Sequence, residues 1–65
     1  MIQNTEIQIY TDGACLSNPG GPGAWAYHIQ YPDSTIQNSS RAYQSTTNNR
    51  MELMAAIFAL EAITQ

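Results

Sequence analysis

Residues 48–56, Asn-Asn-Arg-Met-Glu-Leu-Met-Ala-Ala, decide the fold of this 65-residue chain, because they belong to a segment that is apolar on nearly every side. The pattern predicts a helix from about residue 47 to about residue 63. Over residues 51–63 the only polar side chains are Glu52 and Glu61. A helix of this kind is normally buried on most of its sides. Burial of a lone carboxylate is costly unless it is paired or binds a cation, so we expect Glu52 to meet a partner.

The side chains of this helix fall into three faces at about 100° per residue. One face is large and aliphatic, the next holds methionine and phenylalanine, and the third is small: Leu53, Ile57 and Leu60; Met51, Met54 and Phe58; Ala55, Ala56, Ala59 and Ala62. We expect the small-residue face to lie near Glu52. Three strands cover only one side of a helix, so the remaining faces predict covering elements beyond these residues, in a longer protein or in another chain.

The start of the helix offers several capping residues within residues 45–49, Ser-Thr-Thr-Asn-Asn. Side-chain oxygens of these residue types accept a hydrogen bond from the first free backbone N–H groups of a helix. With Asn49 as the cap, Glu52 takes the position of the acid in a capping box. Glu52 therefore also has a structural interpretation, as an acid at the positive end of the helix, and a metal-binding role is compatible with it.

Three segments before the helix have the patterns of β-strands: residues 5–12, 25–31 and 34–43. We expect the first strand to end at Asp12, because residues 13–23 contain all four glycines and form an irregular loop. A turn begins at Pro32. The short links predict an antiparallel meander. The expected fold is therefore of the α/β class, with a three-stranded antiparallel meander followed by one helix.

Length and composition limit the chain to one domain over residues 1–65. The single cysteine, Cys15, forms no disulfide within the chain, and no Cys/His zinc pattern occurs. Two arginines, Arg41 and Arg50, face five acidic residues, which argues against strong nucleic-acid binding by this chain alone. The sequence has no signal-peptide pattern and no apolar run of roughly 18 residues, so we expect a soluble, cytoplasmic protein with a reduced thiol.

Asp12, at the expected end of the first strand, is the candidate partner of Glu52. Two carboxylates that converge from a strand and a helix predict a metal site, and Mg²⁺ prefers oxygen ligands of this kind. The Asp12–Gly13 dipeptide also has a simpler interpretation, because Asp-Gly is a common turn sequence. The residues that surround Asp12 favour the metal-binding interpretation.

Three stretches together resemble type 1 ribonuclease H, and the match covers nearly the whole chain as the amino-terminal half of that family's domain. They are residues 9–15, Ile-Tyr-Thr-Asp-Gly-Ala-Cys; residues 18–25, Asn-Pro-Gly-Gly-Pro-Gly-Ala-Trp; and residues 46–56, Thr-Thr-Asn-Asn-Arg-Met-Glu-Leu-Met-Ala-Ala. The resemblance implies a ribonuclease H-like sheet of three antiparallel strands followed by two parallel ones, flanked by helices. Only the first three strands and the first helix fall within these residues, so the expected fold is partial.

Members of this family are metal-dependent endonucleases that cut the RNA strand of an RNA–DNA hybrid with four acids and magnesium. By resemblance, Asp12 is the acid that touches both metal ions and Glu52 is the acid of the first helix, with Mn²⁺ as an alternative ion. Gly13 resembles the residue whose backbone approaches the substrate. Four further residues resemble positions that contact the minor groove of the hybrid: Cys15, Asn18, Asn48 and Asn49.

Other interpretations of these residues stay open. Asn48 and Asn49 also suit helix caps, and Cys15 also suits a small inert thiol. The other two acids, the histidine loop and the basic region of the family lie beyond residue 65, so we expect no hybrid cleavage by the isolated chain. The chain is then the amino-terminal part of a ribonuclease H, a half-domain completed by a partner chain or by self-association, or a non-catalytic remnant or binding module.

Overall fold

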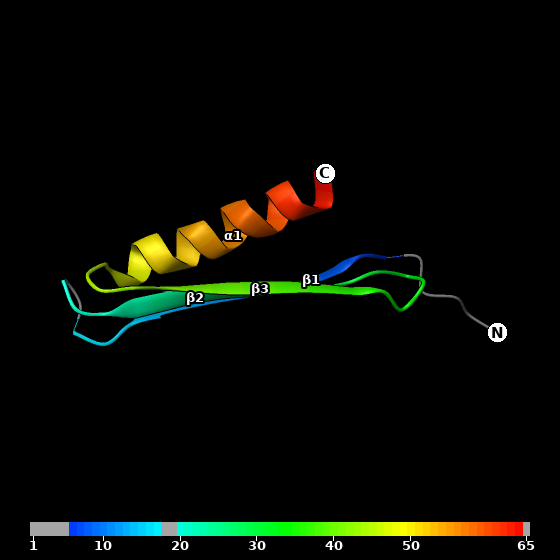
Figure 1. Ribbon diagram of the computed structural model, residues 1–65. Coiled ribbons are helices and arrows are strands. Elements are labelled where there is room, and N and C mark those ends of the chain that lie inside the picture. The colour runs from blue at the N-terminus through cyan, green and yellow to red at the C-terminus, as the bar shows by residue number, and fades with distance from the viewer. Residues whose placement is uncertain (1–5, 18–19, 65) are drawn as a thin grey trace.

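The computed structural model describes residues 6–17 and 20–64, which form three strands and one helix. The elements are β1 (Gln8–Cys15), β2 (Gly23–Gln30), β3 (Ile36–Tyr43) and α1 (Asn48–Thr64). The strands pair antiparallel in the order β1-β2-β3, and α1 lies along one face of the sheet (Figure 1). This arrangement confirms the predicted meander followed by a helix.

Strand β1 does not end at Asp12, so the predicted boundary is wrong. Asp12 pairs with Ala26, Gly13 pairs with Trp25, and the ladder continues to Cys15. The Asp12–Gly13 dipeptide is therefore strand backbone and not a turn. The physical reason is that β2 extends back to Gly23 and supplies hydrogen-bonding partners for residues that the glycine content had assigned to a loop.

Alternation along the strands gives the sheet two different faces. The Trp25 ring stacks on Phe58 of α1 at a centroid distance of 4.7 Å, so the odd-numbered residues of β2 point toward the helix. Their partners on β1, such as Gly13 opposite Trp25, share that face. Asp12 and Ala26 form the neighbouring pair and therefore point to the face that α1 does not cover.

The core lies between α1 and the first two strands. The buried apolar residues combine one sulfur-containing, one aromatic and one branched side chain with three alanines: Met51, Trp25, Ile29, Ala55, Ala59 and Ala62. The backbone of α1 approaches that of β1 and β2 but not that of β3, so the helix lies toward the β1 side of the sheet. The small-residue face of α1 is thus the face that packs, because alanines let a helix approach a sheet closely.

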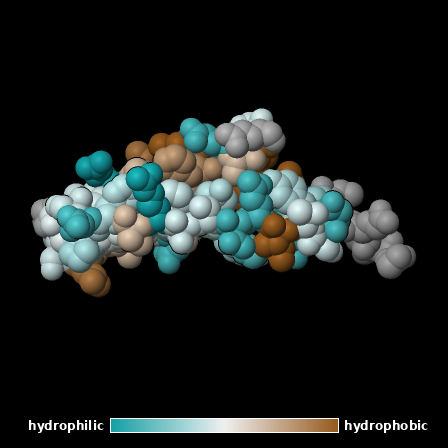
Figure 2. Space-filling model, viewed as in Figure 1, coloured by the Kyte–Doolittle hydropathy of each residue, from teal (hydrophilic) through white to brown (hydrophobic). Residues whose placement is uncertain are grey.

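The outer face of α1 is apolar and exposed. Leu53, Ile57 and Leu60 are 62%, 44% and 59% exposed, respectively, which is unusual for three large aliphatic side chains on one helix. They lie opposite the alanine face, and hydrophobic surface gathers over α1 in Figure 2. Within the described residues the sheet therefore covers α1 on one side only, as expected for three strands against a helix that is apolar on nearly every side.

Gly13 is the point of closest approach between α1 and the sheet. A Cβ atom placed on Gly13 would lie 2.5 Å from the carbonyl oxygen of Met51 and 2.5 Å from the backbone nitrogen of Glu52. No side chain can occupy that space without moving the helix, because the obstructing atoms belong to backbone. The first turns of α1 therefore rest directly on the backbone of β1.

The turn between β2 and β3 is closed by hydrogen bonds around Ser34, whose φ is 73°. The Tyr31 N–H donates to the Thr35 carbonyl at 2.8 Å, and the Thr35 N–H donates to Asp33 Oδ1 at 2.9 Å. Hydrogen bonds from the side chain and the backbone of Thr35 hold the pKa of the Asp33 carboxyl below its ordinary value.

We expect Gly13→Ala to displace α1 and to destabilise the chain by about 2 kcal/mol, the usual range for overpacking. The displacement should change the near-ultraviolet circular dichroism and fluorescence of Trp25, the only tryptophan, because its ring stacks on the helix. Gly20→Ala is the matched control: Gly20 has φ 94° and open space around its Cβ position, so it should lose stability without altering the Trp25 signals. Unchanged Trp25 signals in Gly13→Ala would contradict the proposed contact.

A second expectation concerns pH. Because the folded-state pKa of Asp33 is depressed, its contribution to folding is present above the unfolded-state pKa and is lost as pH falls through the folded-state pKa. Thr35→Val removes the largest cause of the depression and should move the Asp33 titration midpoint upward in carboxyl ¹³C NMR. An Asp33 midpoint that does not change in Thr35→Val would contradict the assigned cause.

Candidate functional site

Thr47 caps the amino terminus of α1. Its Oγ1 accepts a hydrogen bond from the Arg50 N–H at 3.1 Å, and its carbonyl accepts the Met51 N–H at 3.1 Å. With Thr47 as the cap, Arg50 occupies the third helical position. The predicted cap at Asn49 and the capping-box position of Glu52 are therefore wrong, because the helix begins two residues earlier than that prediction required.

Glu52 is exposed, and so is Asp12. The argument that a buried Glu52 needs a partner is therefore wrong, since water reaches this carboxylate. What the structure does bring together is the backbone that carries the two acids. Gly13, the residue after Asp12, touches the backbone nitrogen of Glu52 through the contact described above.

Glu52 lies on the flank of α1 that faces the open edge of β1. Helical residues follow at about 100° steps, and the buried residues of α1 mark the direction of the sheet. Phe58 lies to one side of that direction and stacks on Trp25 of β2. Asn48 and Glu52, four residues apart, lie to the other side, where Asn48 Oδ1 accepts a hydrogen bond from the Cys15 N–H at 2.5 Å.

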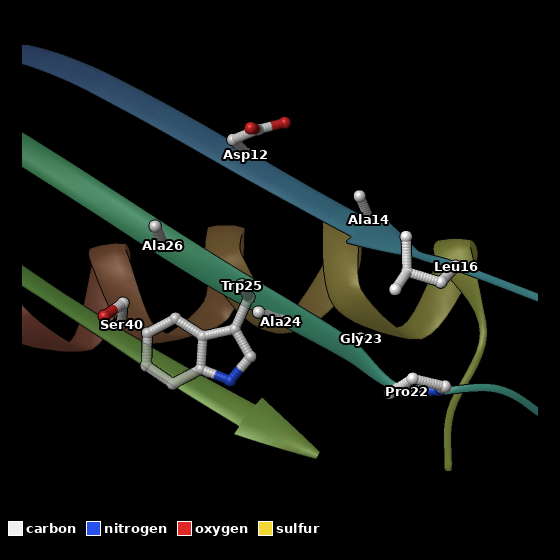
Figure 3. Close-up of a pocket in the computed structure, with 9 residues that line it drawn as sticks. All are labelled: Asp12, Ala14, Leu16, Pro22, Gly23, Ala24, Trp25, Ala26 and Ser40. Atoms are coloured by element: carbon white, nitrogen blue, oxygen red, sulfur yellow. The ribbon is translucent and has the colours of Figure 1, made fainter. Parts of the chain in front are cut away.

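Asp12 projects from the opposite face of the sheet, beside Ala14 and Ala26 (Figure 3). The two acids thus leave the backbone on opposite sides of β1, which is an edge strand of this sheet. A ligand that joins them has to lie at that edge. Within residues 6–17 and 20–64, no group of three or more His, Cys, Asp or Glu side chains could hold a metal ion.

The same face carries an open hollow of about 440 Å³. Apolar residues line most of it, among them Ala14, Leu16 and Ala24, and Asp12 is one of its few polar groups (Figure 3). The sequence pattern did not predict this hollow, because Ala14 lies in the segment assigned to a glycine-rich loop and Ala24 lies between that loop and the predicted second strand.

The residues predicted to meet substrate gather in part around the start of α1. The Cys15 thiol has two carbonyl acceptors within reach of its single hydrogen, Thr46 and Gly21, at sulfur–oxygen distances of 3.3 and 3.4 Å. Asn48 bonds to the Cys15 backbone, and Asn49 is exposed one residue further on. Gly13 lies two residues before Cys15 on the same face of β1. Asn18 lies outside the described residues.

The sequence indicated Thr46 only as a possible helix cap, and its burial was not predicted. Thr46 is 4% exposed, and its backbone N–H and carbonyl pair with Gly21 and Gly20 at 2.9 and 2.8 Å. Its Oγ1 has no hydrogen-bond partner. Thr46 therefore joins the segment before α1 to the loop after β1, a long-range contact that no local pattern signals.

These features define an α/β unit that presents two carboxylates, on adjoining backbone, at one sheet edge. The ribonuclease H family model matches residues 4–65. Three proteins named ribonuclease H are similar to the chain: that of Lachnoclostridium phytofermentans is 53% identical over 64 residues, that of Serratia proteamaculans 51% over 59, and that of Cyanothece sp. 52% over 59. The chain belongs to the ribonuclease H family, which confirms the family expected from the motifs.

The chain spans about two fifths of the length of these relatives. The matched regions cover 92%, 91% and 89% of this chain, but 40%, 37% and 37% of the three relatives, in the order given above. In the part of the chain that the structure describes, no helix is long and apolar enough to cross a membrane.

Because Glu52 is exposed, we expect Glu52→Gln to change the free energy of unfolding by no more than about 0.5 kcal/mol. Its neighbour Met51 is 0% exposed, and Met51→Ala should cost about 3 kcal/mol. Urea unfolding of both variants measures the difference. A loss of stability in Glu52→Gln as large as that in Met51→Ala would mean that the carboxylate is structural.

Proposed function

We propose that the chain supplies Asp12 and Glu52 to an endoribonuclease site that hydrolyses the RNA strand of RNA–DNA hybrids by a two-metal mechanism. The observation that carries the proposal is the contact of Gly13 with the Glu52 backbone, which sets the two acid-bearing positions side by side at the open edge of β1. Membership of the ribonuclease H family supports this assignment.

The donor set suits a hard divalent cation, Mg²⁺ or alternatively Mn²⁺. Both side chains are exposed carboxylates, and such oxygen ligands bind Mg²⁺ while it keeps several waters. Metal ions held in this way activate a water molecule and stabilise the leaving oxygen of a phosphodiester. The chain contributes the position of the two ligands: it holds Asp12 on rigid strand backbone and Glu52 on the first turns of α1.

Five residues are proposed to contact the hybrid near these acids. Gly13 lacks a side chain, and carboxamides both donate to and accept from the 2′-hydroxyl that distinguishes RNA from DNA. Phosphate neutralisation by basic side chains supplies much of nucleic-acid affinity, and this chain has only two of them. Most of the binding affinity for a hybrid must therefore come from basic residues outside these 65. The proposed substrate contacts are Gly13, Cys15, Asn18, Asn48 and Asn49.

We further propose that these 65 residues are inactive alone and belong to a larger catalytic unit. Two acids make an incomplete site, and the relatives named ribonuclease H are about two and a half times as long. A second candidate is a half-domain that another polypeptide, or a second copy, completes. The exposed outer face of α1 and the open edge of β1 favour it, because both offer surface for further packing. A non-catalytic remnant or binding module is the third.

A cytoplasmic location is part of the proposal. It rests on the lone Cys15, which is a free thiol and suits a reducing compartment.

A chimera tests the proposed activity. When this chain replaces the matching region of the Lachnoclostridium phytofermentans ribonuclease H, the product should cleave a labelled RNA–DNA hybrid in Mg²⁺. Asp12→Asn or Glu52→Gln in the chimera should lower the cleavage rate about a hundredfold. This is the usual loss when one group is removed from a preorganised site. The exposed Glu61→Gln is the matched control and should cleave at the parent rate.

The same assay separates the alternatives. We expect the isolated chain to cleave no hybrid, alone or in excess over the substrate. A folded chimera that is inactive would contradict the proposal and favour a binding module, whereas one that keeps its rate after both acid substitutions would contradict the roles of Asp12 and Glu52. Sedimentation of the isolated chain at micromolar concentration tests self-association, which a folded monomer excludes.

A further inference from the structure

The backbone N–H of Cys15 is held by a side chain of the helix and not by a neighbouring strand. The Leu16 N–H donates to the Pro22 carbonyl at 2.8 Å, so that pair is a hydrogen-bonded one. Hydrogen-bonded and non-hydrogen-bonded pairs alternate in an antiparallel ladder. The next pair, Cys15 with Gly23, is therefore non-hydrogen-bonded, and the Cys15 N–H points away from β2 toward the open edge. Asn48 Oδ1 accepts it there at 2.5 Å.

Asn48 is the first residue of α1, four residues before Glu52. Residues four apart lie one above the other on the same flank of a helix. The bond from Asn48 therefore fixes the flank from which Glu52 projects. Gly13 fixes the height of the same turns above the sheet, because the backbone of Met51 and Glu52 rests on it. The packing on Gly13 sets the distance of α1 from the sheet, and the Asn48 bond sets its position along the sheet edge. Together these two contacts define the position of Glu52 relative to Asp12.

The rest of this corner is held independently of Asn48. Thr46 pairs through its backbone with the loop after β1, and the Cys15 thiol donates to the Thr46 carbonyl at 3.3 Å. These bonds anchor the residues before the helix, but none of them acts on α1 itself. The Asn48 bond is a polar contact that reaches directly from α1 to β1 on the Glu52 side.

We propose that Asn48 is a positioning residue: its Oδ1 bond to the Cys15 N–H sets the rotation and register of α1 that align Glu52 with Asp12. The proposal rests on the proposed function for its catalytic meaning, although the geometric claim stands on the fold. Asn48 acts through α1, so its role differs from the substrate contact that the family resemblance implies. Any contact of its carboxamide with a hybrid is additional.

The test compares three variants of the 65-residue chain by NMR. Asn48→Ala removes the acceptor, Asn48→Asp keeps an oxygen at the same place, and Asn49→Ala is the matched control on the exposed neighbour. Two readouts report geometry without metal: hydrogen exchange of the Cys15 amide, and the cross-relaxation between the Gly13 α-protons and the Glu52 amide proton. A third readout, Mn²⁺ broadening of the Asp12 and Glu52 signals, reports joint metal binding.

In Asn48→Ala we expect the Cys15 amide to exchange about fivefold faster, the order expected for loss of one hydrogen bond, and the Gly13–Glu52 cross-relaxation to weaken. The Mn²⁺ concentration that broadens the NMR signals of both Asp12 and Glu52 in the parent chain should no longer broaden both signals in Asn48→Ala. Asn48→Asp and Asn49→Ala should keep the parent cross-relaxation. If Asn48→Ala does not fold, Asn48→Asp decides, because loss of the cross-relaxation despite a retained acceptor would overturn the proposal.

Two outcomes separate this proposal from the proposed function. Unchanged Cys15 exchange and Gly13–Glu52 cross-relaxation in Asn48→Ala, together with weaker binding of an RNA–DNA hybrid, would make Asn48 a substrate contact and overturn the positioning role. Absence of Mn²⁺ broadening in the parent chain, with the two metal-free readouts as expected, would support the positioning role while contradicting metal binding by these two acids.

Discussion

The fold and the site both depend on the direct contact between α1 and the backbone of β1 at Gly13. No Cβ fits there, because the backbone of Met51 and Glu52 occupies the space. The alanines of α1 continue this close approach along the helix, and they are the residues that become buried. The same contact brings the position of Glu52 to the residue after Asp12. Packing and site geometry therefore follow from one requirement, that strand and helix lie backbone to backbone at this point.

Much of the fold could be predicted, since the strand patterns and the long apolar helix are strong local signals. The end of β1 was missed because glycine is common in loops, and sequence alone does not reveal that Gly13 makes room for a helix. Which face of α1 packs was also not settled by periodicity, because nearly every face is apolar. Leu53 and Ile57 offer more apolar surface than the alanines, yet they are exposed. Close approach favoured the small residues over the large ones.

The pairing of Asp12 with Glu52 as candidate ligands came from residue types and motifs and stays a prediction, while the structure shows that the backbone next to Asp12 lies against that of Glu52. The reasoning from burial failed for Glu52, because this carboxylate lies on a part of α1 that the sheet leaves exposed. Thr47 was one of several equivalent caps in the sequence, and only the position of the first helical turn chooses among them. The bond between Asn48 and Cys15 joins residues 33 positions apart, so no local pattern could indicate it.

The open edge of β1 also bears on how the chain behaves at high concentration. By the alternation of the ladder, the outward N–H and C=O groups of Ile9, Thr11 and Gly13 face away from β2, and no lysine or proline interrupts β1. Sheet edges without such residues are templates for intermolecular strand pairing and aggregation. The partly exposed Ile7 and Ile9 add apolar surface beside that edge. Strand pairing between copies would therefore engage the very strand that carries Asp12, and a polypeptide that pairs with β1 would block it.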